Sequence, residues 1–205
     1  IKITLPDGAV KELPKGSTAM DVALSISEGL ARNVISAKVN DKTVEVTTPI
    51  TTDANVTLHT FNDADGKKAF WHSSAHILAQ ALEKLYPGIK LTIGPAIENG
   101  FYYDVDSGEH TIREEDFKKI EDKFLELARE KADFKLREVS KADALAKYKT
   151  EGNEYKVELI ENLNDGEITF CDHSDFTDLC RGGHIPNTGI VKAIKVISVF
   201  CSYWR

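Results

Sequence analysis

The stretch that most constrains this chain is the run Phe70–Leu82, which predicts a helix with two histidines beside its apolar face. Its apolar residues recur at intervals of four and three positions, the period of one helix face: Trp71, Ala75, Leu78, Leu82 and Leu85. His72 and His76 are four residues apart, so they share a neighbouring face of the same helix. We therefore expect a core helix that presents two imidazoles to a cleft.

A second pair of candidate site residues lies further along the chain, in the segment Cys180–His184 (Cys-Arg-Gly-Gly-His). Each pair alone is a weak signal, because such spacings are often incidental. Two pairs within one predicted domain indicate a single site with three imidazoles and one thiol. A thiolate can serve as a metal ligand, nucleophile or base, and imidazole titrates near neutral pH. The four residues therefore favour either proton-transfer chemistry or a metal ion.

Composition and charge narrow the class of protein. The chain has 205 residues and a net charge of −7, which argues against a dedicated nucleic-acid binder with a basic surface. Its three cysteines, Cys171, Cys180 and Cys201, have no disulfide-scaffold spacing, as expected in a reducing compartment. No signal peptide and no apolar run of membrane-spanning length is present. We expect a cytoplasmic protein.

Both ends of the chain look cut. No methionine precedes Ile1, and the last residues, Ser198–Arg205, form an apolar aromatic run that reads as a strand. The sequence is therefore expected to be a fragment of a longer protein.

Residues 1–62 are predicted to form a β-grasp, ubiquitin-like module. The expected strands are Ile1–Leu5, Val10–Leu13, Val34–Val39, Thr43–Val46 and Asn55–Phe61. A capping box at Thr18 and Asp21 opens a helix that Gly29 is expected to close. Asn40-Asp41 predicts a hairpin turn. The module holds one histidine, His59, which we interpret as structural.

Residues 63–205 are predicted to form an α+β domain, a mostly antiparallel sheet packed by helices. The polar run 62–68 is the expected linker. Helices are expected after Thr111 and Ser140, which both begin capping patterns. The expected strands and short elements are Leu91–Ile93, Phe101–Val105, Phe134–Val139, Val157–Ile160, Ile168–Cys171 and a final strand Ile194–Tyr203.

Other candidate site residues are weaker when considered alone. Asp178 lies two residues before Cys180, so in an extended segment both face the same side, although a loop carboxylate is an equal alternative. Lys156 reads as a surface lysine. Tyr102 and Tyr103 must point to opposite sides. Cys171 and His173 are interpreted as structural.

Taken together, the motifs resemble the N-terminal half of bacterial threonyl-tRNA synthetases. The resemblance is carried by Trp71–His76, Gly94-Pro95, Asn99–Asp104, Asp178–Pro186 and Tyr203–Arg205. It covers essentially the whole chain: residues 1–62 resemble the TGS domain, and residues 63–205 resemble the editing domain, whose paired signature is shared with alanyl-tRNA synthetases. Gly182-Gly183 is expected to stand where other members carry a bulkier residue or proline, which affects loop flexibility only.

This resemblance implies a proofreading function within a threonine-tRNA ligase. The full enzyme of that family charges tRNA(Thr) with threonine using ATP. The editing domain hydrolyses the ester of mischarged seryl-tRNA(Thr), with the acceptor end as its partner. The class II aminoacylation core, the anticodon-binding domain and an expected homodimer belong to the longer chain, and no membrane partner is expected.

The resemblance also implies roles for individual residues. The expected site comprises His72, His76, Cys180, His184, Lys156 and Asp178, with Tyr103, Gly182 and Gly183 contacting substrate. His72 is expected to activate a water that attacks the ester carbonyl. Lys156 or the amides near Gly182-Gly183 would stabilise the oxyanion, and Asp178 would hold the substrate amino group.

The same four side chains determine which cofactor and which alternative functions we expect. No cofactor is expected for editing, although zinc is possible at His72, His76, Cys180 and His184. The ATP and zinc of the family belong to the aminoacylation core. Two alternatives stay open: a non-catalytic accessory module that holds structural zinc, and a free-standing trans-editing hydrolase.

Overall fold

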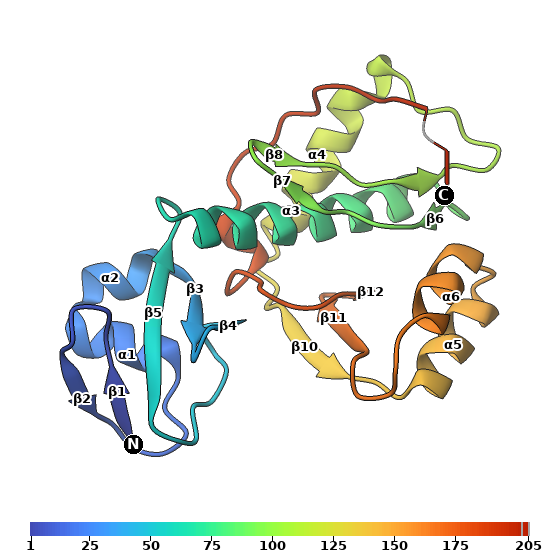
Figure 1. Ribbon diagram of the computed structural model, residues 1–205. Helices are drawn as coiled ribbons and strands as arrows, with labels where there is room; N and C mark the ends of the chain where they lie inside the picture. The colour runs from blue at the N-terminus through green and yellow to red at the C-terminus, as the bar shows by residue number, and fades with distance from the viewer. Residues whose placement is uncertain (202, 205) are drawn as a thin grey trace. The chain divides into compact units, whose positions relative to one another are not determined.

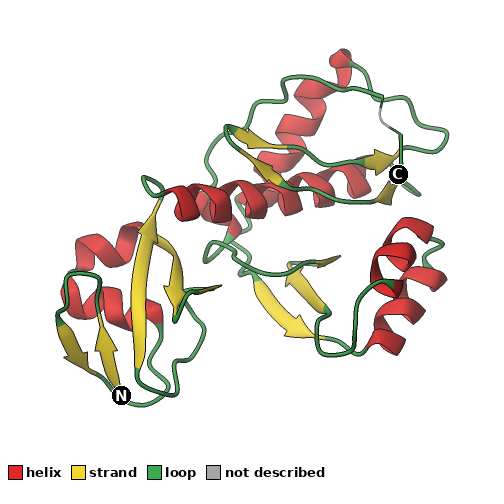
Figure 2. Cartoon of the chain, viewed as in Figure 1, coloured by secondary structure: helices red, strands yellow, loops and turns green. Residues whose placement is uncertain are grey.

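The computed structural model describes residues 1–201 and 203–204. Its contacts group the chain into two compact units, residues 1–73 with 182–186 and residues 74–181 with 187–205. Figure 1 labels the elements, and Figure 2 shows that each unit combines helices with strands. The expected mixed α+β class, with mostly antiparallel pairing, is confirmed.

The first unit contains a β-grasp sheet with the strand order β2-β1-β5-β3-β4. Its strands are β1 (Lys2–Thr4), β2 (Val10–Glu12), β3 (Val34–Val39), β4 (Lys42–Val44) and β5 (Ala54–Thr60). β1 and β5 pair in parallel, while the other pairs are antiparallel. The predicted turn at Asn40 and Asp41 joins β3 to β4 with positive φ at both residues, as a tight hairpin requires.

Two helices follow β2, because Ser27 divides the predicted single helix. Helix α1 (Ala19–Ile26) begins at the predicted capping box, where Thr18 Oγ1 accepts from the Asp21 N–H. Helix α1 ends where the Ser27 N–H donates to the Ala23 carbonyl. The Ser27 hydroxyl then caps the start of α2 (Glu28–Asn33). The prediction that Gly29 closes the helix is therefore wrong, since Gly29 lies inside α2.

Helix α3 (Ala64–Leu85) is longer than predicted. The Asp63 carboxylate accepts from the Thr60 N–H at 2.6 Å, and helix begins at the next residue. Most of the predicted linker at 62–68 is thus helical, and the prediction of an extended linker there is wrong. The domain boundary itself stays a prediction. Between Ser73 and Leu82 nearly every side chain is buried, so α3 is a central helix with more than one apolar face.

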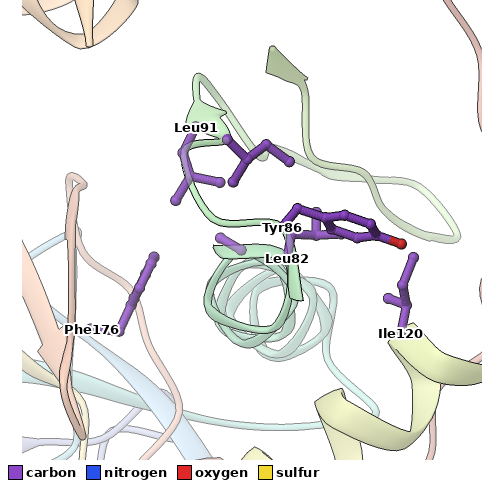
Figure 3. Packing of buried hydrophobic residues seen from close by; sticks show 7 residues of the cluster. Leu82, Tyr86, Leu91, Ile120 and Phe176 are labelled. Carbon is purple, nitrogen blue, oxygen red and sulfur yellow. The ribbon is translucent and has the colours of Figure 1, made fainter. Parts of the chain in front are cut away.

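The second unit packs its core around the C-terminal half of α3. Figure 3 shows Leu82 and Tyr86 of α3 with Leu91 on one side, Ile120 of α4 beyond the tyrosine ring, and Phe176 opposite. Ala79 and Ile89 complete the buried cluster. This packing fixes the helix that carries His76.

An antiparallel sheet of order β10-β11-β12 supplies the other wall of this unit. Its strands are β10 (Lys135–Glu138), β11 (Thr169–His173) and β12 (Phe176–Leu179). The turn between β11 and β12 has Ser174 at a φ of 50°, and sequence patterning missed β12. Short strand pairs join β6 (Lys90–Leu91) to β9 (Val105–Asp106) and β7 (Ala96–Ile97) to β8 (Gly100–Phe101). The predicted strand Phe101–Val105 is therefore divided between β8 and β9, which belong to different strand pairs.

Three further helices complete the second unit: α4 (Phe117–Ala128), α5 (Lys141–Thr150) and α6 (Glu154–Glu161). Ser140 caps α5 as predicted. The predicted cap at Thr111 is wrong, because a 3-10 turn η1 (Glu114–Asp116) precedes α4 and the Asp116 carboxylate accepts from the Arg113 N–H. The apolar stripe predicted for α4 is buried at Ile120 and Phe124.

The C-terminal segment corrects one further prediction. After a second 3-10 turn, η2 (Thr188–Ile190), residues 194–201 and 203 are not in a strand, and Ser202 and Arg205 lie outside the described residues. A strand needs a partner ladder, and the apolar alternation of this segment finds none among the described residues. Within the described part of the chain, no helix is long and apolar enough to cross a membrane.

Candidate functional site

The two sequence motifs supply one group of four potential ligands. His72 and His76 lie one turn apart on α3, and Cys180 and His184 lie on the segment that follows β12. One ligand atom from each of the four residues lies within 4.8 Å of the others. These are the two pairs that the sequence analysis assigned to one site, and their shared function stays a prediction.

His184 is held from two directions. Its Nδ1 lies 2.8 Å from Oε1 of Glu45, and its ring stacks on His72 at a centroid distance of 4.9 Å. The next residue, Ile185, is fully buried, and its N–H donates to Ser73 Oγ at 2.9 Å. The imidazole of His184 is itself fully buried, so its orientation is fixed by these contacts.

A buried network surrounds His76. Lys156 Nζ donates to Asp178 Oδ1 at 2.6 Å, and the Tyr103 hydroxyl donates to Asp178 Oδ2 at 2.6 Å. His76 Nδ1 lies 3.3 Å from the same Oδ2. Lys156, Asp178 and His76 are almost completely buried, which places a lysine, an imidazole and a carboxylate in a water-poor environment.

Burial and charge together shift the pKa values of this network. Burial opposes the charged form of His76, but the Cys180 thiolate and the Asp178 carboxylate outweigh it and raise the pKa of His76 to about 10. Burial likewise opposes ionisation of Asp178, but Lys156 and His76 hold the pKa of Asp178 well below its usual range. Burial and the neighbouring Asp178 raise the pKa of Tyr103. At neutral pH, therefore, His76 is a cation, Asp178 an anion and Tyr103 a neutral donor.

Local structure explains how these side chains reach one place. Lys156 lies on α6, whose first turn is capped by Asn153, and Asn153 in turn donates to the Leu91 carbonyl. Tyr103 points into the network, while Tyr102 is 42% exposed, as their alternation predicted. The Tyr103 ring packs on Gly94, where an added Cβ would lie 2.2 Å from Cδ2. Asp178 lies opposite Cys171 in the register of β11 and β12, and the Cys180 N–H donates to the Thr169 carbonyl at 3.0 Å.

The glycines of the Cys180–His184 segment have a conformational reason. Gly182 and Gly183 have φ values of +92° and +84°, a region that side chains with a Cβ rarely adopt. The Gly183 N–H donates to Glu45 Oε1 at 3.3 Å. These two glycines therefore let the backbone between the thiol and the imidazole adopt a conformation that other residues would strain to reach.

Sequence reasoning missed Glu45 and underestimated Lys156. Nothing in the local sequence marks either residue, because a single charged residue next to a turn or on a short helix reads as solvated surface. Their partners, His184 and Asp178, lie 139 and 22 positions away. Cys171 and His173, interpreted as structural, are buried on β11, where His173 Nε2 lies 3.1 Å from Gln80 Oε1.

The donor set also fits a zinc ion. Three imidazoles and a thiol are ligand types that zinc accepts. His76 and His184 each have a carboxylate at the Nδ1 nitrogen, as is common around metal-binding histidines. The site can therefore support metal binding or general acid–base chemistry.

Comparison with known proteins places these features in a family context. The TGS domain model matches residues 1–60, and the model of the threonyl and alanyl tRNA synthetase second additional domain matches residues 168–202. Threonine–tRNA ligases from Flavobacterium psychrophilum and Flavobacterium johnsoniae are each 67% identical over the whole chain. The ligase from Cytophaga hutchinsonii is 57% identical over the same span. The chain spans 31 to 32% of the length of these relatives.

Proposed function

We propose that this chain, an N-terminal fragment of the threonine–tRNA ligase family with a TGS domain and a second additional domain, forms the editing region of such a ligase. Its reaction is hydrolysis of the ester that joins serine to tRNA(Thr). The observation that carries this proposal is the group of three histidines and one cysteine beside the buried Lys156–Asp178 pair.

The chemistry of the two amino acids explains why such a ligase needs a second site. Serine lacks one methyl group of threonine, and a difference of that size supplies only about 1–3 kcal/mol of discrimination. A hydrolytic site that admits serine and excludes the methyl group of threonine by contact removes serine that was attached to tRNA(Thr) by mistake. Both substrates carry the hydroxyl, so the discrimination must come from the wall that meets the methyl group.

His72 is the best candidate for the base that activates water. The raised pKa of His76 keeps that imidazole protonated at neutral pH, so it cannot accept a proton. His72 is the less buried of the two helix histidines and stacks on His184. In the proposed reaction His72 takes a proton from water, and the resulting hydroxide attacks the ester carbonyl. The carbon–oxygen bond to the terminal ribose oxygen of the tRNA then breaks, and that oxygen takes the proton back from His72.

Positive charge for the oxyanion comes from the buried network. Lys156 and protonated His76 are buried cations, and charge–dipole interactions are strong in a water-poor site. The Gly183 N–H already donates to Glu45, which makes it a weaker candidate than Lys156 for the oxyanion. Asp178 accepts from Lys156 and Tyr103 and contacts His76, so it can bind the substrate ammonium only through its remaining acceptor capacity.

No cofactor is required for this scheme, since an ester needs only an activated water. Zinc would be held by His72, His76, Cys180 and His184, and it would supply Lewis acidity toward the ester carbonyl only while one coordination position stays open. A non-catalytic module with structural zinc is the second candidate function, and the carboxylates at His76 and His184 favour it.

We further propose that the longer protein charges tRNA(Thr) using ATP, as a cytoplasmic homodimer.

The test is release of serine from seryl-tRNA(Thr) and of threonine from threonyl-tRNA(Thr) by the full-length ligase. We expect fast, serine-selective release that survives a chelator and is lost in the double variant His72→Ala, Cys180→Ala. Exposed Glu12 of the TGS domain provides a control, and Glu12→Gln should hydrolyse like the wild type.

Three other results would change this assignment. Activity lost on chelation and restored by zinc would make the site a zinc hydrolase. Stoichiometric zinc without serine release would favour the structural module. Equal, slow release by wild type and the double variant would refute an editing function.

A further inference from the structure

Glu45 lies in the part of the chain that matches the TGS domain, yet it contacts a histidine of the candidate site. Its Oε1 lies 2.8 Å from His184 Nδ1 and accepts the Gly183 N–H at 3.3 Å. The Glu45 side chain is 13% exposed, and the His184 side chain is fully buried. One carboxylate oxygen therefore holds both the backbone and the ring of the segment that carries His184.

The backbone around Glu45 is fixed as well. Glu45 follows β4, and its carbonyl accepts from the Thr48 N–H at 3.0 Å in a turn. The next residue, Val46, is fully buried against α1, and its carbonyl accepts from the Met20 N–H at 3.0 Å. Glu45 is thus presented from a packed turn and not from a free loop.

The chemistry of this contact determines which nitrogen of His184 carries a proton. The ordinary form of a glutamate side chain at neutral pH is the ionised carboxylate. An ionised carboxylate only accepts hydrogen bonds, so Nδ1 of His184 must be the donor. In neutral His184 the lone pair is then on Nε2.

We propose that Glu45 of the TGS domain is a positioning residue for the hydrolysis: it fixes the tautomer and the ring orientation of His184. This inference rests on the proposed editing function. It gives the TGS domain a direct part in the site, because a residue of the turn after β4 sets the state of a site imidazole. Partners of this kind behind metal-ligating histidines commonly contribute 10- to 100-fold to affinity or activity, and we expect an effect of the same order at His184.

The experiment uses the full-length ligase with Glu45→Gln, and with Glu12→Gln as the matched control on an exposed carboxylate of the same domain. Glutamine keeps the shape of Glu45, but its amide can also donate, so it no longer imposes one tautomer on His184. Serine release from seryl-tRNA(Thr) is followed over a range of tRNA concentrations, which separates kcat from KM. Threonylation of tRNA(Thr) by the same preparations reports intact protein.

We expect Glu45→Gln to lower kcat for serine release about 10- to 100-fold, with KM within about twofold of the wild type and threonylation retained. A loss of packing alone would instead lower the amount of active enzyme and reduce both reactions together. Glu12→Gln should leave both reactions unchanged.

A double variant shows whether Glu45 acts through His184. At enzyme concentrations that allow the residual reaction to be followed, Glu45→Gln should add no further loss to His184→Ala. Additive losses, or a Glu45→Gln enzyme that releases serine at the wild-type rate, would overturn the inference and leave the proposed function standing. A wild-type enzyme without serine release would instead refute the proposed function and this role with it.

Discussion

Lys156 Nζ lies 2.6 Å from Asp178 Oδ1, and each of the two side chains is only 3% exposed. A lysine on α6 and an aspartate on β12 therefore share a site from which water is largely excluded. Asp178 also accepts the Tyr103 hydroxyl and contacts His76, so its negative charge holds the whole network together.

Removing one member of this pair should strongly destabilise the protein. Asp178→Asn leaves Lys156 buried without a counter-charge, and breaking a buried pair from one side typically costs about 3–5 kcal/mol. Urea unfolding of the 205-residue chain measures this loss. The double variant Lys156→Met, Asp178→Leu should lose less unfolding free energy than the sum of the losses of Lys156→Met and Asp178→Leu measured singly. Losses that simply add, or that stay below about 1 kcal/mol, would show that the pair is not coupled.

The raised pKa of His76 predicts that stability falls at alkaline pH. The ordinary pKa of histidine is 6.5, and the folded value is about 10. Below pH 6.5 the imidazole is protonated in both the folded and the unfolded chain, so its full stabilisation is present. That stabilisation declines as the pH rises from 6.5 and is lost above about 10.

The variant His76→Gln provides the comparison for this effect. In metal-free buffer, the difference in unfolding free energy between the wild type and His76→Gln should shrink steadily between about pH 6.5 and 10. Parallel curves for the two proteins over this range would mean that His76 does not carry the charge described.

Gly94 should tolerate no side chain, because the Tyr103 ring occupies the space. A Cβ at Gly94 would lie 2.2 Å from Tyr103 Cδ2, so Gly94→Ala must displace the ring that donates to Asp178. We expect Gly94→Ala to destabilise the chain by about 1–3 kcal/mol, as in other overpacked sites.

A second glycine provides the control for Gly94. Gly29 lies within α2, where an added Cβ comes no closer than 3.9 Å to Ser27 Oγ. Gly29→Ala should be neutral or stabilising by up to about 1 kcal/mol, because alanine favours helix. Thermal unfolding that ranks the two variants in the opposite order would contradict the packing described around Tyr103.

Local signals in the sequence were sufficient for much of the β-grasp module. Alternation predicted its strands, and the capping box at Thr18 was confirmed because its hydrogen bonds involve residues only three apart. The same type of pattern failed at Thr111, where Asp116 instead bonds to Arg113. It also failed at Gly29, because the hydroxyl of Ser27 starts a second helix.

Predictions that depend on distant partners fared differently. The four-residue His/Cys group could be proposed from the sequence because its two motifs are individually visible there. Only the family resemblance made Lys156 a site candidate, because its buried partner Asp178 lies on another element. Glu45 was missed entirely, because its partner is 139 positions away. The final strand was predicted from apolar content alone, which does not provide the neighbouring strand that a ladder needs.

The most direct test of the central claim is the accumulation of seryl-tRNA(Thr) when the full-length ligase is supplied with serine, ATP and tRNA(Thr). The editing account predicts little accumulation with the wild type and a large accumulation with the variant His72→Ala, Cys180→Ala, while threonylation stays equal in both. Equal accumulation of seryl-tRNA(Thr) by the two enzymes would contradict an editing role for this site.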